Sequence, residues 1–250
     1  MSVDVFLAAV LQRKLRSIAE EMGVTVLRTT RSPLLNQAGD LGTAIFNSQG
    51  EILEQAEYIP IIALSLRLAC QHVRKFFGDD IHPGDVILHN DVYYGGLQHA
   101  DTGVLVPVFH DREIVAWVAC KGHQADIGGA VAGGCNPEAT EVWQEAFRIP
   151  PVKVCDAGKT RHDVWNLIFS NVRLRDIVEA DMRALMGACE VGRREVAALV
   201  EKIGLAAFEE ATGWMMDSAE ARMRAEIREI PNGIYRGESS AIFDTKHGRE

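Results

Sequence analysis

The stretch Gly95-Gly96-Leu97-Gln98-His99-Ala100-Asp101 decides the fold that this sequence predicts, because Gly122-His123-Gln124-Ala125-Asp126-Ile127-Gly128-Gly129 repeats its pattern further along the chain. Each stretch sets a histidine and a carboxylate beside glycines, which let backbone and ligand approach closely. Between them, Val104 to Cys120 is mostly apolar and is predicted as two strands joined at His110-Asp111-Arg112-Glu113. Such a hairpin would carry both stretches to one end of a sheet, so we expect a metal or polar-substrate site built from paired loops.

The composition is that of an ordinary soluble globular protein of 250 residues, with 47% hydrophobic and 24% charged residues. This length allows a core large enough for an enzyme. Lys and Arg total 26 against 35 Asp and Glu, a formal charge of -9. We therefore expect no nucleic-acid partner and no attraction to an anionic membrane.

The five cysteines include no C-x-x-C pair, which favours reduced thiols in a cytoplasmic protein over a disulfide framework or a zinc ribbon. The first residues, Met1 to Asp4, lack the basic and apolar regions of a signal peptide. No apolar run approaches the length of about 18 uncharged residues that would suggest a membrane span. The expected location is the cytoplasm.

Periodicity and turn residues predict the first elements of the chain. Apolar residues recur every three or four positions from Val3 to Met22, which predicts an amphipathic helix that Gly23 would end. Residues 40–53 are predicted as a β-hairpin, and Ile61 to Phe77 as a helix capped by Gly78. A turn at Pro83-Gly84-Asp85 leads into a short strand, 86–88.

The rest of the chain is predicted as mostly helical. A polar turn begins at Glu138, and Pro150-Pro151 excludes a central strand at that point. Helices are expected at 163–169, 180–203 and 205–228, followed by a turn at 231–233 and a strand over 234–243.

These elements predict an α/β protein of the mixed α+β kind, with β-hairpins and a mixed sheet that carries the glycine-rich loops. We expect a sheet-containing domain with the site at residues 1–175, a helical segment at 176–230, and an incomplete strand region at 231–250. A final strand without a partner is unusual in a natural domain, so the chain is expected to be either a truncated product or one piece of a larger protein.

The residues of the paired loops are candidate metal ligands. His99 and Asp101 flank one residue, and His123 and Asp126 are three apart, so each pair can face one cation. Two imidazoles with one or two carboxylates suit Mn, Zn or Fe. The alternative is that these residues cap turns and bond to backbone amides.

Two further patterns bear on catalysis. Glu145 and Asp126 are the candidate catalytic residues. Glu145 would be a general acid or base if it borders the loops, although a solvated helix face explains Glu141 and Glu145, four residues apart, equally well. Neither glycine-rich loop fits a phosphate-binding motif, so ATP, if it is used, is expected to bind elsewhere.

Several motifs, taken in order, resemble those of the hydantoinase B/oxoprolinase family over roughly Ala19 to Gly204. They are Asp40-x-x-x-Ala44-Ile45-Phe46, Pro83-Gly84-Asp85, Asn90-Asp91-x-Tyr93-x-Gly95-Gly96, His123-x-x-Asp126-Ile127-Gly128-Gly129, Glu145-x-x-Arg148-Ile149-Pro150-Pro151-Val152-Lys153, Asn171-x-Arg173, Asp181 and Gly192-Arg193-Arg194. This many ordered matches is a specific signal.

The resemblance implies a B-type subunit that acts with an ATP-binding A-type partner. In that family the partner phosphorylates a carbonyl or enol oxygen, and the B-type chain then hydrolyses the activated amide or carboxylates the activated enol. The substrate would be a cyclic amide in the hydantoinase and oxoprolinase branches, or a ketone in the acetone and acetophenone carboxylase branch. A non-catalytic assembly subunit and a self-sufficient metallohydrolase are the rival hypotheses.

The resemblance also implies a divalent metal, manganese in the acetone carboxylase branch, held by a His/Asp/His set. The Asp and the second His fall on Asp101 and His123, and Asp126 would be a further ligand or would hold the His123 tautomer. The family pattern Thr-His-x-x-Asp is replaced here by Leu97-Gln98-His99-Ala100-Asp101. Either His99 takes the first ligand position through a loop shift, or Gln98 alters the site.

Overall fold

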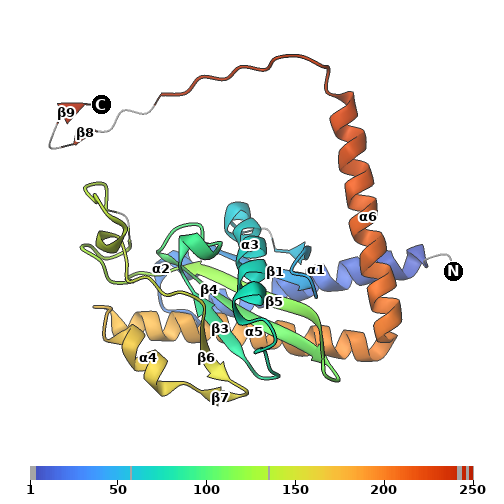
Figure 1. Ribbon diagram of the computed structural model, residues 1–250, viewed down its shortest axis with the longest axis horizontal. Helices are drawn as coiled ribbons and strands as arrows, with labels where there is room; N and C mark the ends of the chain where they lie inside the picture. The colour runs from blue at the N-terminus through green and yellow to red at the C-terminus, as the bar shows by residue number, and fades with distance from the viewer. Residues whose placement is uncertain (1–3, 57, 135, 241–243, 246–247, 250) are drawn as a thin grey trace.

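The computed structural model describes residues 4–240 except 57 and 135, together with 244–245 and 248–249 (Figure 1). Its centre is a seven-stranded sheet with the strand order β2-β1-β5-β4-β3-β6-β7. The strands are β1 Leu41–Asn47, β2 Ile52–Gln55, β3 Val86–His89, β4 Asp101–His110, β5 Glu113–His123, β6 Val152–Asp156 and β7 Lys159–Thr160. The predicted α/β class is confirmed.

The sheet is antiparallel in every pairing of these strands, so the expectation of a mixed sheet was wrong. The reason lies in the connections, because β1–β2, β4–β5 and β6–β7 are hairpins and a short hairpin joins only antiparallel strands. The predicted central hairpin is confirmed, with Asp111 at its turn in the left-handed region, φ 53°.

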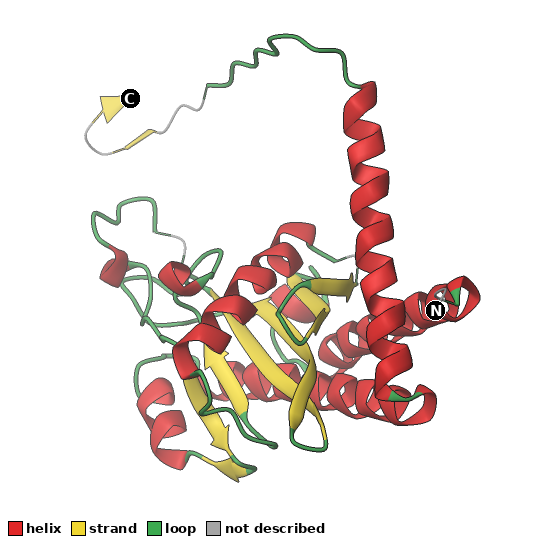
Figure 2. Cartoon of the chain, turned by 45° about the vertical axis from the view of Figure 1, so that its right-hand side comes forward, coloured by secondary structure: helices red, strands yellow, loops and turns green. Residues whose placement is uncertain are grey.

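Helices cover both faces of the sheet (Figure 2). They are α1 Val5–Thr29, α2 Pro33–Asn36, α3 Pro60–Phe77, α4 His162–Phe169, α5 Arg175–Ile203 and α6 Leu205–Glu229, with short 3-10 turns η1 Val92–Tyr94 and η2 Val142–Gln144. One face of β5 carries Val118 and Cys120 into the larger core with α1 and α5, and the other carries Trp117 and Ala119 into the core under α3. This alternation gives the two sheet faces separate cores.

The predicted end of the first helix and the predicted strand at 234–243 differ from the structure, because both depend on contacts with distant residues. Gly23 does not end the first helix, which continues to Thr29; a Cβ at Gly23 would lie 2.2 Å from Cε2 of Tyr58. Glycine there makes room for the tyrosine ring. Residues 234–240 are exposed and not in a strand, because no described strand pairs with them; residues 241–243 of that prediction lie outside the described part.

The C-terminal helix leaves the body of the protein. α6 buries Phe208, Ala211 and Met215 at its start and then rises away from the sheet, exposed from Ala219 onwards (Figure 1). Two short strands, β8 Asp244–Thr245 and β9 Gly248–Arg249, pair with each other. Among the described residues, no helix is long and apolar enough to cross a membrane.

Candidate functional site

The two glycine-flanked loops meet at one end of the sheet. In the pairing of β4 with β5, Asp101 is the direct partner of His123. The chain entering β1 joins them from the other side of β5, because the backbone N–H of His123 donates to the carbonyl oxygen of Asp40 at 3.1 Å. Three strands therefore contribute one side chain each to this end of the sheet.

Four side chains form the contact group, which we call the Asp101 cluster: Asp40, Gln98, Asp101 and His123. His123 Nδ1 lies 3.2 Å from Asp101 Oδ1 and 3.7 Å from Asp40 Oδ2. Gln98 Nε2 lies 3.0 Å from both Asp101 Oδ1 and His123 Nδ1. The side chain of Asp101 is fully buried, whereas Gln98 is exposed at the rim.

The charges of the cluster act on each other. The hydrogen bond to Asp101 raises the pKa of His123, and the charges of Asp101 and Asp40 add to this against the effect of burial. Burial raises the pKa of the Asp40 carboxyl, which the charge of His123 opposes. On its far side, His123 Nε2 lies 3.1 Å from the carbonyl oxygen of Gly133, which orients the ring.

His99 does not join this cluster in the contacts of the described residues. Its ring is buried, Nε2 has no partner, and the charges around it are those of Asp91, Arg148 and Glu145. A turn explains the difference, since the N–H of Asp101 donates to the carbonyl oxygen of Gln98 at 3.1 Å. This turn folds the Gln98 side chain back over Asp101, so Gln98 takes the place predicted for His99.

Asp126, predicted as a ligand and as a catalytic group, is fully buried and fully bonded elsewhere. Its Oδ1 accepts from the N–H of Gly128 at 3.1 Å and from Arg173 Nη1 at 3.0 Å. Its Oδ2 accepts from the N–H groups of Arg173 and Leu174, the latter at 3.0 Å. The carboxylate therefore ties the second glycine-rich loop to the start of α5 and makes no described contact with His123.

Glu145 ends the short turn η2, where its N–H donates to the carbonyl oxygen of Val142 at 3.1 Å. Its charge acts on His99, not on His123 or Asp40. Gly129 packs against its backbone, because a Cβ on that glycine would lie 2.5 Å from the Glu145 carbonyl carbon. The structure thus sets Glu145 and His99 together, apart from the Asp101 cluster.

A second polar row lies directly behind the cluster and escaped the sequence analysis. Lys121 pairs with Gly103 across the sheet, and His89 pairs with Gly103 from the other side. Lys121 and His89 are fully buried, and a Cβ at Gly103 would lie 3.4 Å from both Lys121 Cε and His89 Nε2. The signal was available, since Lys121 lies two residues before His123 and must share its face of the strand.

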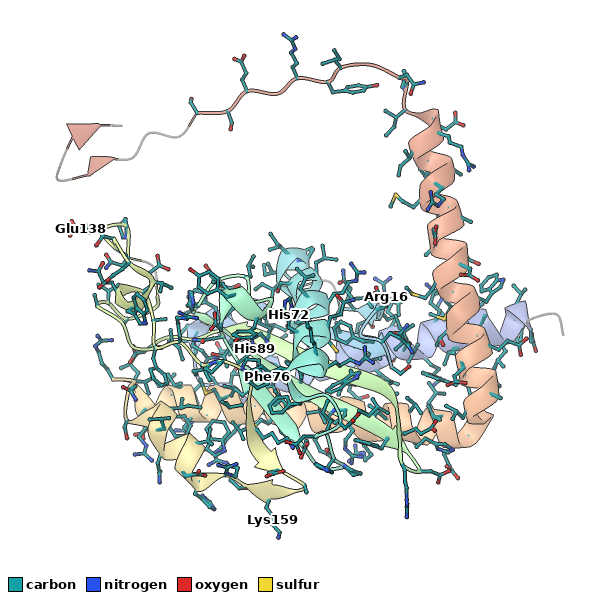
Figure 3. The ribbon with its side chains drawn as sticks, in the orientation of Figure 1. Arg16, His72, Phe76, His89, Glu138 and Lys159 are labelled. Carbon is teal, nitrogen blue, oxygen red and sulfur yellow. The ribbon has the colours of Figure 1, made fainter. Side chains whose placement is uncertain are left out.

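The two ionisable side chains of this row have lowered pKa values. Lys121 Nζ donates to Ser65 Oγ of α3 at 2.8 Å, and burial lowers the pKa of Lys121 to about 8, against the charge of Asp101. Both ring nitrogens of His89 lack a partner among the described residues, and burial and Lys121 lower its pKa to about 3. Figure 3 shows His89 in the interior next to α3, the helix that carries His72 and Phe76.

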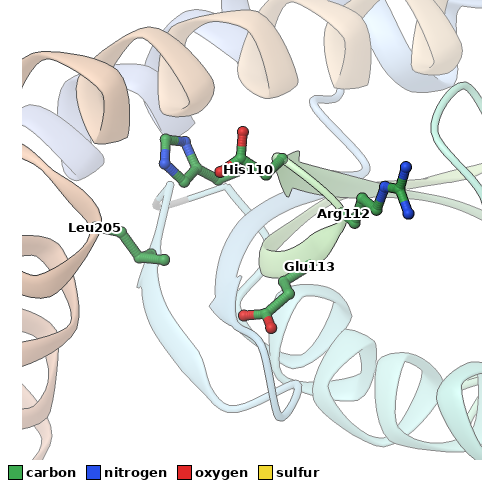
Figure 4. Close-up of a pocket in the computed structure, with 5 residues that line it drawn as sticks. His110, Arg112, Glu113 and Leu205 are labelled. Carbon is green, nitrogen blue, oxygen red and sulfur yellow. The ribbon is translucent and has the colours of Figure 1, made fainter.

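Two other places on the protein bring polar groups or a hollow together. The carboxylates of Asp85 and Asp156 approach His82, but Lys153 already lies among them, with Nζ 3.1 Å from Asp85 Oδ2 and 3.5 Å from Asp156 Oδ1. A hollow of about 730 Å³ lies at the β4–β5 turn beside Leu205, at the opposite end of the hairpin from the cluster (Figure 4). Neither contains a residue predicted for the site.

The donor set of the Asp101 cluster fits a divalent cation. Asp101 Oδ1, His123 Nδ1 and Gln98 Nε2 lie within 3.2 Å of one another, and the buried Asp101 Oδ2 has no described partner. An amide can turn to present its oxygen in place of its nitrogen. Two carboxylates, one imidazole and one amide oxygen are ligands for hard or borderline divalent metals.

Comparison with known proteins gives the family of the chain. The family described as Hydantoinase B/oxoprolinase matches residues 4–248. The chain is 40% identical over 247 residues to the caprolactamase subunit beta of Pseudomonas jessenii, covering 99% of this chain and 42% of that protein. It is 28% identical over 200 residues to the acetophenone carboxylase delta subunit of Aromatoleum aromaticum, covering 80% and 29%.

The crystal structure of the ATP-dependent caprolactamase from Pseudomonas jessenii superposes with a TM-score of 0.92 at 40% identity, covering 99% of this chain and 43% of that one. The chain thus spans less than half the length of the relatives it matches.

Proposed function

Because this chain belongs to the hydantoinase B/oxoprolinase family, we propose that it is the B-type part of an ATP-dependent hydrolase that opens cyclic amides. It would act in the cytoplasm with an ATP-binding A-type partner. The observation that carries the proposal is the Asp101 cluster, which stands at the end of a sheet whose fold matches a caprolactamase with a TM-score of 0.92.

The glycine-rich loops support a partner as the source of ATP. A Cβ at Gly95 would lie 2.4 Å from the backbone nitrogen of Ala69, and one at Gly129 would lie 2.5 Å from the backbone of Glu145. These glycines permit close packing of backbone on backbone, and their loops carry no phosphate-binding motif.

The chemistry follows from the charges of the cluster. A divalent cation such as Mn, Zn or Fe, held by Asp40, Asp101, His123 and the Gln98 amide oxygen, would polarise a carbonyl or lower the pKa of a bound water. Asp101, which is buried, would orient His123 through the 3.2 Å contact. Asp40 is half-buried, with Oδ2 3.7 Å from His123 Nδ1, and would add a second carboxylate to the ligands.

A ketone carboxylase is the second candidate function. It is favoured by the similarity to the acetophenone carboxylase delta subunit over 80% of this chain. Both reactions begin with an oxygen activated by ATP, and both need developing negative charge to be stabilised. The cluster would serve either chemistry.

The test uses the protein purified together with its A-type partner. ATP-dependent opening of caprolactam, hydantoin and 5-oxoproline is measured beside bicarbonate-dependent consumption of acetone and acetophenone. Asp101→Asn should lower the active reaction by at least about a hundredfold, a typical loss when one charge-stabilising group is removed. Asp111→Asn, at the opposite end of the same hairpin, is the matched control. Activity that survives Asp101→Asn would support a non-catalytic assembly role.

A further inference from the structure

Gln98 lies beside both central side chains of this cluster, and its amide contacts each of them. Asp101 Oδ1 and His123 Nδ1 lie 3.2 Å apart, and Gln98 Nε2 lies 3.0 Å from each. An amide NH₂ has two N–H donors. One donates to the Asp101 carboxylate, and the amide nitrogen also contacts the His123 ring, whose Nε2 lies 3.1 Å from the Gly133 carbonyl oxygen. The amide thus stands at the point where the two side chains meet.

The same side chain offers an oxygen ligand when it turns. With the oxygen inward, Gln98 would face the negative Asp101 Oδ1, so this orientation is stable only if a cation lies between them. Gln98 is exposed at the rim, which leaves its amide free to rotate. A bound cation would then meet three oxygen donors, from Asp40, Gln98 and Asp101, and one nitrogen donor from His123.

We infer that Gln98 is a specificity-determining residue of this site. Compared with a site that has histidine at position 98, it raises the preference for a hard, oxygen-preferring cation such as Mn²⁺ over Zn²⁺. The inference rests on the proposed function and names its cofactor class. Carboxylate and amide oxygens suit Mn²⁺ and Mg²⁺, whereas imidazole nitrogens suit Zn²⁺. Replacing the amide oxygen by an imidazole changes the donor set from one nitrogen to two.

The experiment compares metal affinities of the purified chain and its variants. Binding of MnCl₂ is followed by the loss of the free Mn²⁺ electron paramagnetic resonance signal, and ZnCl₂ is then titrated as a competitor. In Gln98→His the ratio of Zn²⁺ to Mn²⁺ affinity should rise at least about tenfold above that of the native chain, the scale on which changes around a metal alter affinity. Gln98→Ala, which removes the oxygen donor, should weaken Mn²⁺ binding on the same scale.

His99→Ala is the matched control, because His99 is the neighbouring residue yet makes no described contact with the cluster. It should leave the affinity ratio unchanged. An equal ratio in the native chain and Gln98→His, or an equal shift in His99→Ala, would overturn the inference while the proposed function stands. A native chain that binds no Mn²⁺ would overturn both the inference and the metal part of the proposed function. Should Gln98→His not fold, Gln98→Ala decides alone through its loss of Mn²⁺ affinity.

Discussion

His123 Nδ1 lies 3.2 Å from Asp101 Oδ1, directly across the pairing of β4 with β5, and this contact is the first cause of the raised pKa of His123. A histidine whose pKa is raised by folding contributes stability that is present below its unfolded pKa and lost as the pH rises through the folded pKa. The pair should therefore stabilise the protein more in mild acid than in alkali.

Asp101→Asn tests this relationship. The difference in the free energy of unfolding between native protein and variant should be larger at about pH 5.5 than at about pH 8.5, on either side of the usual histidine pKa of about 6.5. Urea denaturation at the two pH values measures it. Asp111→Asn should show no such dependence, and a constant difference for Asp101→Asn would contradict the assignment.

His89 should make the protein sensitive to acid. Burial lowers its pKa to about 3, so the folded chain keeps it neutral while the unfolded chain protonates it below about 6.5. The contribution of the neutral histidine to the free energy of unfolding is fully present above the pKa that His89 has in the unfolded chain. It is lost by about 1.4 kcal/mol per pH unit as the pH falls from there toward the pKa of His89 in the folded chain. His89→Leu should flatten the loss of stability between about pH 6 and 4, measured by urea denaturation. A slope as steep as that of the native protein would contradict this.

The buried ammonium of Lys121 should depend on Ser65, its hydrogen-bond acceptor at 2.8 Å. Ser65→Ala leaves the ammonium buried without that acceptor, and should cost about 1.5–3 kcal/mol, the strength of a hydrogen bond to a charged group. Lys121→Met removes the charge and leaves an apolar side chain, so it should cost little. Adding Lys121→Met to Ser65→Ala should restore stability in thermal unfolding. If the two costs simply add, the ammonium does not need Ser65.

Two glycines with similar backbone angles should respond differently to alanine. Gly129 and Gly158 have φ of 75° and 79°, but only Gly129 has backbone within 4 Å of the added Cβ, at 2.5 Å. Gly158→Ala should cost only the left-handed strain of about 1–2 kcal/mol. Gly129→Ala should cost clearly more, because the Glu145 backbone must move. Equal losses in urea denaturation would show that the close approach is relaxed.

Local signals were sufficient wherever an element depends on its own residues. The hairpin of β4 and β5 follows from two apolar runs with a polar turn, and α3 ends at Gly78, which has φ 55°. Gly204 separates α5 from α6 as predicted. The prediction that Gly23 ends the first helix was wrong, because this glycine makes room for the ring of Tyr58, which packs against it only in the folded protein. Local sequence does not report such a contact.

The sequence by itself determined that the stretches carrying Asp101 and His123 would meet at one end of the sheet, because one hairpin joins them. The register shift between Val108 and Phe109 sets Asp101 opposite His123, since equal counting from the His110–Glu113 pair would set it opposite Gly122. Only the tertiary structure decided what surrounds them. Asp40 arrives from another strand, and a local turn returns Gln98 to the cluster in place of His99. Asp126 accepts a hydrogen bond from Arg173, which lies just before the start of α5. A carboxylate bonds to whichever donors folding brings to it, and chain spacing alone does not contain that information.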